Sequence, residues 1–97
     1  MAILNSSSVE TLPIIADIQK GYGDWIVMVF DNDVNSVDEV VQILITATKC
    51  GVDEAVMETW EIHHLGKSVV HHGMESVCHE VGAIIASIGI KVEVRQE

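Results

Sequence analysis

The feature that most constrains the fold is an unbroken apolar run of six residues, Trp25 to Phe30. The run is short and rich in β-branched and aromatic residues, which favour strands. It is apolar at every position, whereas a strand with one face in water alternates apolar and polar residues. We therefore predict a central strand over 25–30.

A helix start follows this strand. Ser36-Val37-Asp38-Glu39 is a capping box, in which the Ser36 hydroxyl holds the Glu39 amide and the Glu39 carboxylate reaches back. Apolar residues then recur at spacings of three and four, which indicates one buried helix face. That face consists of Val37, Val40, Val41, Leu44 and Ile45. Lys49 in the expected last turn and Gly51 after it predict where the helix ends.

The rest of the chain shows five further patterned segments. In chain order they are a helix over 53–61, a turn over 64–67, a strand over 68–71, a helix over 74–88 and a half-exposed edge strand over 90–95. The first of these helices would direct Ala55, Val56, Thr59 and Trp60 toward the core, and the second would direct Val77, Cys78, Val81, Ile84, Ile85 and Ile88. The order is β-α-α-β-α-β. We predict an α+β two-layer sandwich, with three helices on one face of a three-stranded antiparallel sheet.

Length and composition predict one small domain. Ninety-seven residues, 48% of them apolar, can form a single core. Residues 1–23 hold a run of three serines, the only proline and two glycines, which predicts a flexible N-terminal arm before a folded domain over 24–97. No apolar run approaches the roughly 20 residues of a membrane helix, and the first residues lack a basic segment. We therefore expect a cytoplasmic protein with no membrane partner.

Charge and cysteine usage exclude other classes. Five Lys and Arg against 15 Asp and Glu give a net charge of −10, which repels nucleic-acid phosphates and anionic lipids. Cys50 and Cys78 form no CxxC pair and lie among apolar residues, so we interpret both as core thiols. No serine or cysteine has the base and orienting group that activate a nucleophile. We expect no enzyme activity, no cofactor and no nucleic-acid partner.

A candidate site begins where the 25–30 strand ends. Asp31, Asn32 and Asp33 lie between that strand and the next helix, and loops at strand ends commonly carry binding residues. Two carboxylates and an amide offer several acceptors to a cationic ligand. The same residues also suit a plain turn, because carboxylates favour the positive end of a helix dipole.

A second motif supports the interpretation as a site. His63 is followed by Gly66-Lys67, at a fixed distance from the acidic triplet and with helical patterns between them. This arrangement resembles the ClpS family, the adaptors that deliver N-end-rule substrates to the Clp protease. The resemblance runs without a gap from about Val27 to Lys67 and continues more weakly to the last strand.

The resemblance implies a module that binds the free N-terminus of proteins beginning with a bulky apolar residue, with a Clp AAA+ unfoldase of the ClpA or ClpC type as its partner. Carried over, Asp31, Asn32, Asp33 and His63 would bind the α-amino group. An ammonium has three donors and no acceptor, so oxygens and a neutral imidazole suit it. Five residues fall where the family lines its side-chain pocket: Asn35, Val37, Thr59, Ile62 and Ile90.

The chain departs from the family pattern at several positions. The family triplet usually reads Asn-Asp-Asp, whereas here it reads Asp-Asn-Asp. Val37 and Thr59 replace two usual pocket methionines, so the preferred first residue can differ. The charged positions with which the family docks on the unfoldase correspond to Ser76 and Val81, which cannot form the same ion pairs.

Two alternatives belong to other functional classes. Imidazoles near carboxylates can bind zinc or nickel, and the five candidates are His63, His64, His71, His72 and His79. Neighbouring residues on a strand point to opposite faces, however, so His71 and His72 cannot share one site in a regular strand. A plain dimeric interaction domain is the second alternative, in which the last strand pairs between chains.

Overall fold

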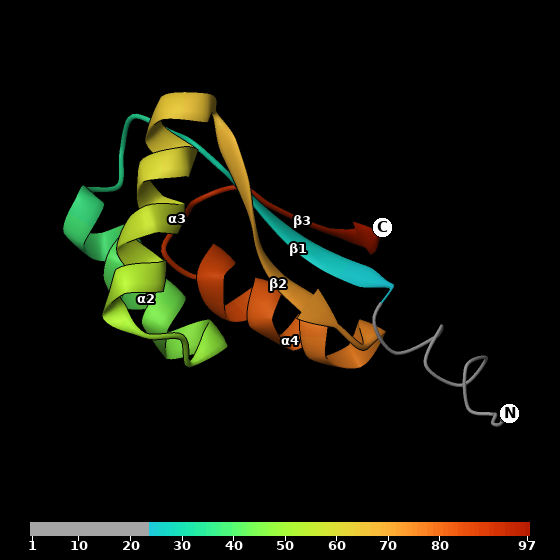
Figure 1. Ribbon diagram of the computed structural model, residues 1–97. Coiled ribbons are helices and arrows are strands. Elements are labelled where there is room, and N and C mark those ends of the chain that lie inside the picture. The colour runs from blue at the N-terminus through green and yellow to red at the C-terminus, as the bar shows by residue number, and fades with distance from the viewer. Residues whose placement is uncertain (1–23) are drawn as a thin grey trace, which may run out of the picture.

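The computed structural model describes residues 24–97, so the predicted arm over 1–23 lies outside the described residues. Six elements follow one another: β1 (Trp25–Phe30), α2 (Val37–Thr48), α3 (Val52–Leu65), β2 (Lys67–Gly73), α4 (Glu75–Ala86) and β3 (Val92–Gln96). Figure 1 shows α2 and α3 side by side, with α4 running along the sheet. The element order and the α+β class confirm the prediction.

The strands form one antiparallel sheet in the order β2-β1-β3. β1 pairs with both neighbours, so it is the central strand that its apolar run predicts. β3 lies at an edge of the sheet, also as predicted. The register of β1 on β2 shifts between Val27 and Met28, and an irregularity of this kind bends the strand and increases its twist.

The middle of β1 is buried on both faces. Val27 and Val29 belong to the main core cluster, and the alternate residues Ile26 and Met28 are also buried. Because successive strand residues point to opposite faces, neither face of β1 is open to water. The helices supply most of the remaining core: Val40, Leu44, Ala47, Ala55, Ile62, Cys78, Val81 and Ile85.

α2 begins as the capping box predicts but ends differently. The Glu39 amide donates to Ser36 Oγ (3.1 Å), and the Ser36 amide donates to Glu39 Oε1 (2.9 Å). At the other end Lys49 itself adopts the left-handed conformation (φ 65°), and Gly51 is the N-cap of α3. The prediction that Lys49 lies in the last turn of α2 and that Gly51 ends this helix is therefore wrong. α3 already starts at Val52, so the chain must turn before Gly51.

α3 is longer than predicted. It continues past Glu61 to Leu65 and is capped by Gly66, whose φ of 92° favours glycine. The predicted turn over 64–67 is therefore wrong except for its glycine. His64 remains helical and stacks on Trp60, with ring centroids 4.4 Å apart.

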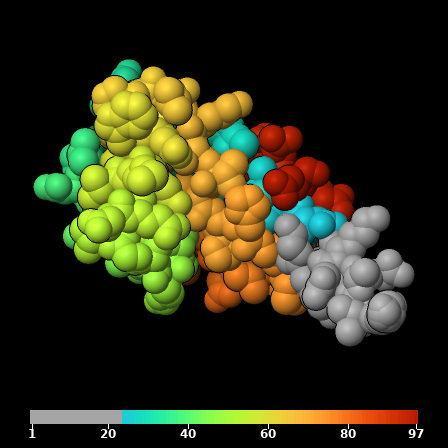
Figure 2. Space-filling model, in the orientation of Figure 1, coloured from blue at the N-terminus to red at the C-terminus, as the bar shows by residue number. Residues whose placement is uncertain are grey.

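The predicted core face of α3 is partly wrong. Ala55 and Thr59 are buried, but Val56 and Trp60 are half exposed. The helix packs through a narrow face, which leaves the neighbouring positions on its outer surface. Figure 2 shows this outer surface of α3, in yellow-green, over much of one face of the molecule.

The remaining boundaries shift by a few residues. β2 is longer than the predicted 68–71, α4 is shorter than 74–88, and β3 starts two residues later than position 90. Cys78 is buried as predicted, whereas Cys50 is half-buried against the core and Val77 is exposed. Across residues 24–97, each helix falls short of the length and apolar character that crossing a membrane requires.

α4 packs closely on β3 at Gly82. A Cβ atom built on Gly82 would lie 2.7 Å from Cγ2 of Val94 and 3.4 Å from Cγ1 of Val92. The first distance is shorter than carbon atoms in a packed interior tolerate. The missing side chain therefore lets the helix approach the edge strand.

Gly82→Ala is expected to lower the free energy of unfolding by about 1 kcal/mol. Alanine gains up to about 1 kcal/mol as the better helix former, but overpacking against β3 costs about 1–3 kcal/mol. Urea denaturation measures the difference. Gly73→Ala is the control, because a Cβ there meets only His71 Nε2 at 3.5 Å and Cδ2 at 3.9 Å. A Gly82→Ala variant as stable as wild type would contradict the close packing.

Candidate functional site

Three chain segments meet at the end of β1. The Asp31 amide donates to the Gly66 carbonyl (3.0 Å), and Phe30 lies opposite Lys67 in the register of β1 on β2. Gly66 caps α3, and His63 lies in the last turn of that helix. The loop after β1 and the end of α3 are therefore held against each other.

The side chains of Asp31 and His63 make the central contact of the site. Oδ1 of Asp31 lies 3.0 Å from Nδ1 of His63, 32 residues along the chain, and both side chains are partly exposed. An ionised carboxylate only accepts hydrogen bonds, so Nδ1 carries the hydrogen in this contact. In a neutral imidazole, Nε2 is then a bare acceptor. Nε2 is buried and has no hydrogen-bond partner in the part of the chain that the structure describes.

The two asparagines organise the loop after β1. Oδ1 of Asn32 accepts from the amides of Val34 (3.2 Å) and Asn35 (3.1 Å), and its Nδ2 donates to Asn35 Oδ1 (2.8 Å). Nδ2 of Asn35 donates in turn to the Ile88 carbonyl after α4 (2.9 Å). Both polar ends of Asn32 are thus engaged within the loop, and Asn35 fastens the loop to the end of α4. Asp33 is exposed.

The residues predicted to line a side-chain pocket fall into two groups. Thr59, Ile62 and Ile90 are at most 4% exposed, whereas Val37 is 54% exposed in the first turn of α2 and Asn35 is half-buried. The Thr59 hydroxyl donates to the Ala55 carbonyl within α3 (2.7 Å). Its polar group is therefore satisfied, and its methyl group is free to pack.

An open groove of about 360 Å³ lies apart from the contact of Asp31 with His63. It is lined by Asp38, Glu39, Gln42, Ile43, Thr46 and Ile88. By helical geometry these α2 residues lie on the side of the helix opposite Val37. None of the five predicted pocket residues lines this groove.

The other histidines have separate surroundings. Nδ1 of His64 lies 2.9 Å from the Trp60 carbonyl, on the exposed side of α3. His72 and His79 each face a different carboxylate, at 3.7 and 3.6 Å. Within residues 24–97, no group of three metal-ligating atoms includes a histidine. The structure thus does not bring the five histidines together as the zinc or nickel hypothesis requires.

Cys78 and His79 do not form a catalytic pair. The Cys78 thiol is fully buried, and the neighbouring His79 is exposed. Burial raises the pKa of Cys78 above its ordinary value, which favours the unreactive thiol over the nucleophilic thiolate. The pair therefore has neither the geometry nor the protonation state of a catalytic cysteine and its base.

Comparison with protein families assigns the chain. The family model described as ATP-dependent Clp protease adaptor protein ClpS matches residues 20–90. The chain belongs to the ClpS family. Membership makes it an adaptor in Clp proteolysis, in a family of adaptors and not of enzymes. The resemblance drawn from the acidic triplet and the histidine motif is thereby confirmed.

A solved structure agrees on the ClpS fold. ClpS2 of Agrobacterium tumefaciens, bound to L-phenylalaninamide, matches with a TM-score of 0.72 at 15% sequence identity. The match covers 77% of this chain and 98% of that chain. At this identity the likeness shows the fold alone. None of the curated protein sequences compared with this chain matches it.

Ser76 and Val81, the two positions that the resemblance placed at the docking surface, differ in exposure. Ser76 is exposed near the start of α4, whereas Val81 is buried in the core. A buried valine cannot contact a partner protein.

Sequence reasoning missed two contacts that build the site. The bond from Asn35 to the Ile88 carbonyl spans 53 residues, and the bond from the Asp31 amide ends on the Gly66 carbonyl. A backbone carbonyl has no sequence signature, so only the fold could place these acceptors. The loop-closing role of Asn32 did have a signal, because asparagine commonly bonds the amide two residues later.

Asp31→Asn tests which nitrogen of His63 carries the hydrogen. A carboxylate requires Nδ1–H, whereas an amide can donate or accept. We expect neutral His63 to be the Nδ1–H tautomer in wild type and to populate the Nε2–H tautomer in Asp31→Asn. Imidazole nitrogen chemical shifts measure the tautomer. Asp33→Asn removes the same charge at the exposed neighbouring carboxylate and should leave the tautomer unchanged. An Nε2–H tautomer in wild type would contradict the assignment.

Proposed function

We propose that the chain captures the free α-amino group of proteins whose first residue is bulky and apolar, and delivers them to a Clp AAA+ unfoldase of the ClpA or ClpC type. The contact of Asp31 with His63, which leaves Nε2 without a partner, is the observation that supports binding of the α-amino group. Family membership supports the adaptor half.

The α-amino group would be recognised by its three hydrogens. Nε2 of His63 would accept one, and the carboxylates of Asp31 and Asp33 would accept the others directly or through water. Each such charge-assisted bond contributes about 1.5–3 kcal/mol, so acetylation of the amine should abolish most of the affinity. The His63 side chain is partly exposed, whereas its Nε2 is buried, so the ring would have to turn for Nε2 to accept from the amine.

The first side chain of the bound protein would pack beside His63. Thr59 lies four residues before His63 on α3, a spacing that puts both on one helix face, and its buried side chain has a satisfied hydroxyl. Val37 supplies exposed apolar surface at the start of α2. These neighbours favour an apolar first residue over a charged one.

The ligand of the structurally similar A. tumefaciens protein has the chemistry that we propose. L-phenylalaninamide combines a free α-amine with a bulky apolar side chain. Its N-acetyl derivative keeps the side chain and loses the ammonium. The two compounds therefore form a matched pair of probes.

Calorimetric titration of the full chain with both compounds tests capture. We expect L-phenylalaninamide to bind and the acetylated compound not to bind. His63→Ala should weaken binding at least about tenfold, which is the loss of one charge-assisted bond. His72→Ala removes an exposed histidine of β2 and is the control. Equal binding of the two compounds would refute amine capture.

Val37→Met tests the contact with the first side chain. A longer side chain at this exposed position should leave less room, so peptides that begin with Trp should lose at least about threefold in affinity relative to peptides that begin with Leu, on the scale of one CH₂ group. Fluorescence anisotropy of labelled peptides measures the ratio. Val52→Met, at an exposed position in the first turn of α3, is the control. An unchanged ratio would remove Val37 from the site.

Delivery needs a test of its own, because neither Ser76 nor Val81 offers a docking charge. A folded reporter that begins with Phe, incubated with a Clp unfoldase and its peptidase, should be degraded faster when the chain is added. His63→Ala should remove the acceleration. Capture without acceleration would refute delivery and leave a protein that sequesters its ligands.

A further inference from the structure

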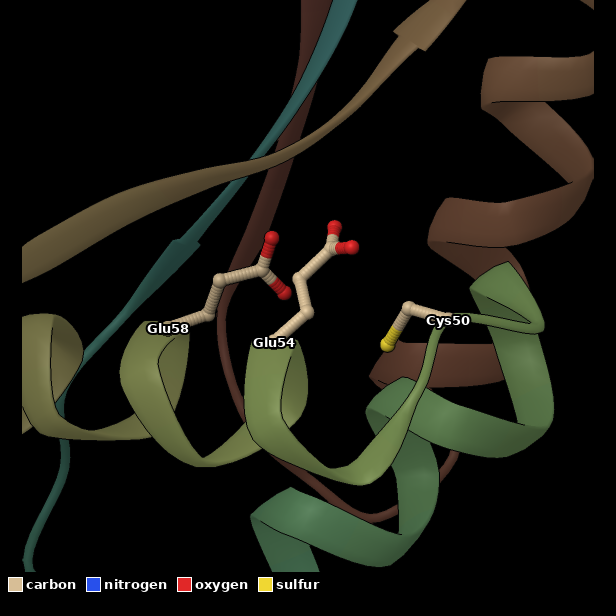
Figure 3. A group of neighbouring side chains, drawn as sticks. All are labelled: Cys50, Glu54 and Glu58. Atoms are coloured by element: carbon tan, nitrogen blue, oxygen red, sulfur yellow. The ribbon is translucent and has the colours of Figure 1, made fainter.

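Three metal-ligating side chains converge at the start of α3. Cys50 lies in the connection before the helix, Glu54 in its first turn and Glu58 one turn later. One donor atom of each, the Cys50 sulfur and a carboxylate oxygen of each glutamate, lies within 4.8 Å of the other two. Figure 3 shows the glutamates projecting from successive turns of α3, with Cys50 on the connection beside them.

We propose that Cys50, Glu54 and Glu58 bind a divalent transition-metal cation, Zn²⁺ by preference, and leave a fourth position open to water. Zn²⁺ accepts both thiolate and carboxylate ligands, usually four in a tetrahedron. A thiolate disfavours the hard cations Mg²⁺ and Ca²⁺, which prefer oxygen. The donor set therefore selects the class of metal.

The geometry allows closure around an ion. Zn–S bonds of about 2.3 Å and Zn–O bonds of about 2.0–2.2 Å place tetrahedral donors about 3.5 Å apart. The present separations of up to 4.8 Å must therefore shrink by about 1 Å, which rotation about the glutamate side-chain bonds can supply. Glu54 and Glu58 are four residues apart, so the helix already holds them on one face.

The carboxylate of Glu58 has an unsatisfied acceptor. Its Oε1 is buried and has no hydrogen-bond partner among residues 24–97, which is rare for a buried polar atom. Burial, followed by the neighbouring Glu54 and Glu61, raises the pKa of Glu58 to about 8. A metal ion between the two side chains would neutralise the charge of both carboxylates.

This site differs from the metal site that the sequence suggested. The sequence suggested the histidines as metal ligands, and it predicted Cys50 as a core thiol. Cys50 instead lies half-buried beside α3, because that helix starts at Val52. None of the three ligands belongs to the proposed amine site, so metal binding and peptide binding can be tested apart.

Titration of the reduced full chain with Co²⁺ tests the site, because a cobalt–thiolate bond absorbs in the near ultraviolet. We expect this absorption to saturate at one ion per chain and to disappear when Zn²⁺ is added. Cys50→Ser should abolish it, and Glu58→Gln should weaken Co²⁺ binding at least about tenfold. Glu61→Gln makes the same substitution one turn along the helix and should change the affinity by less than about twofold. L-phenylalaninamide binding should be unchanged in Cys50→Ser.

A second readout does not depend on the variants folding well. In the native wild type, Zn²⁺ should slow the reaction of Cys50 with a thiol reagent at least about tenfold. No thiolate absorption, absorption that persists in Cys50→Ser, or equal weakening by Glu61→Gln would overturn the proposal. A Cys50 thiol whose reactivity is unchanged by Zn²⁺ would overturn it too.

Discussion

The burial of β1 on both faces is the constraint on which the rest of the structure depends. The backbone N–H and C=O groups of a strand that is buried from water need hydrogen-bond partners within the protein. β1 must therefore be paired along both edges, and β2 and β3 supply those pairings. Val27 and Val29 then anchor the helices through the common core. α4 approaches the sheet most closely at Gly82, where no side chain separates it from β3. The helices cover the face of β1 that carries Val27 and Val29.

The candidate site follows from where this strand stops. Polar residues cannot continue a strand buried on both faces, so the chain leaves the sheet at Asp31. There the end of α3 lies beside it, and the carboxylate meets His63 at 3.0 Å. Asn32 and Asn35 hold the loop in shape through bonds within it and to the end of α4. Rigid surroundings of this kind orient a binding side chain before its ligand arrives, which lowers the entropy cost of binding.

Both proposed sites would bind a cation. The chain carries a net charge of −10, and its polar clusters consist mainly of acceptors. At the end of β1, carboxylates and an imidazole nitrogen suit an ammonium, which has only donors. At the start of α3, two carboxylates and a thiol suit a metal ion. The two sites occupy opposite ends of α3, so the same helix would serve both without sharing a ligand.

The sequence by itself determined the element order, the central strand, the start of α2 and the family, because apolar periodicity, the capping box and the spacing of the triplet from His63 are local patterns. It misplaced the ends of α2 and α3, where Lys49 rather than a glycine turns the chain and Gly66 ends a longer helix. It also misplaced Val56 and Trp60, because periodicity cannot show how narrow a face the neighbouring elements cover. Only the tertiary structure decided that Asp31 contacts His63, that Asn35 reaches the Ile88 carbonyl and that Cys50 joins two glutamates. Each of these contacts depends on where distant backbone segments lie, and that position follows from packing of the whole core.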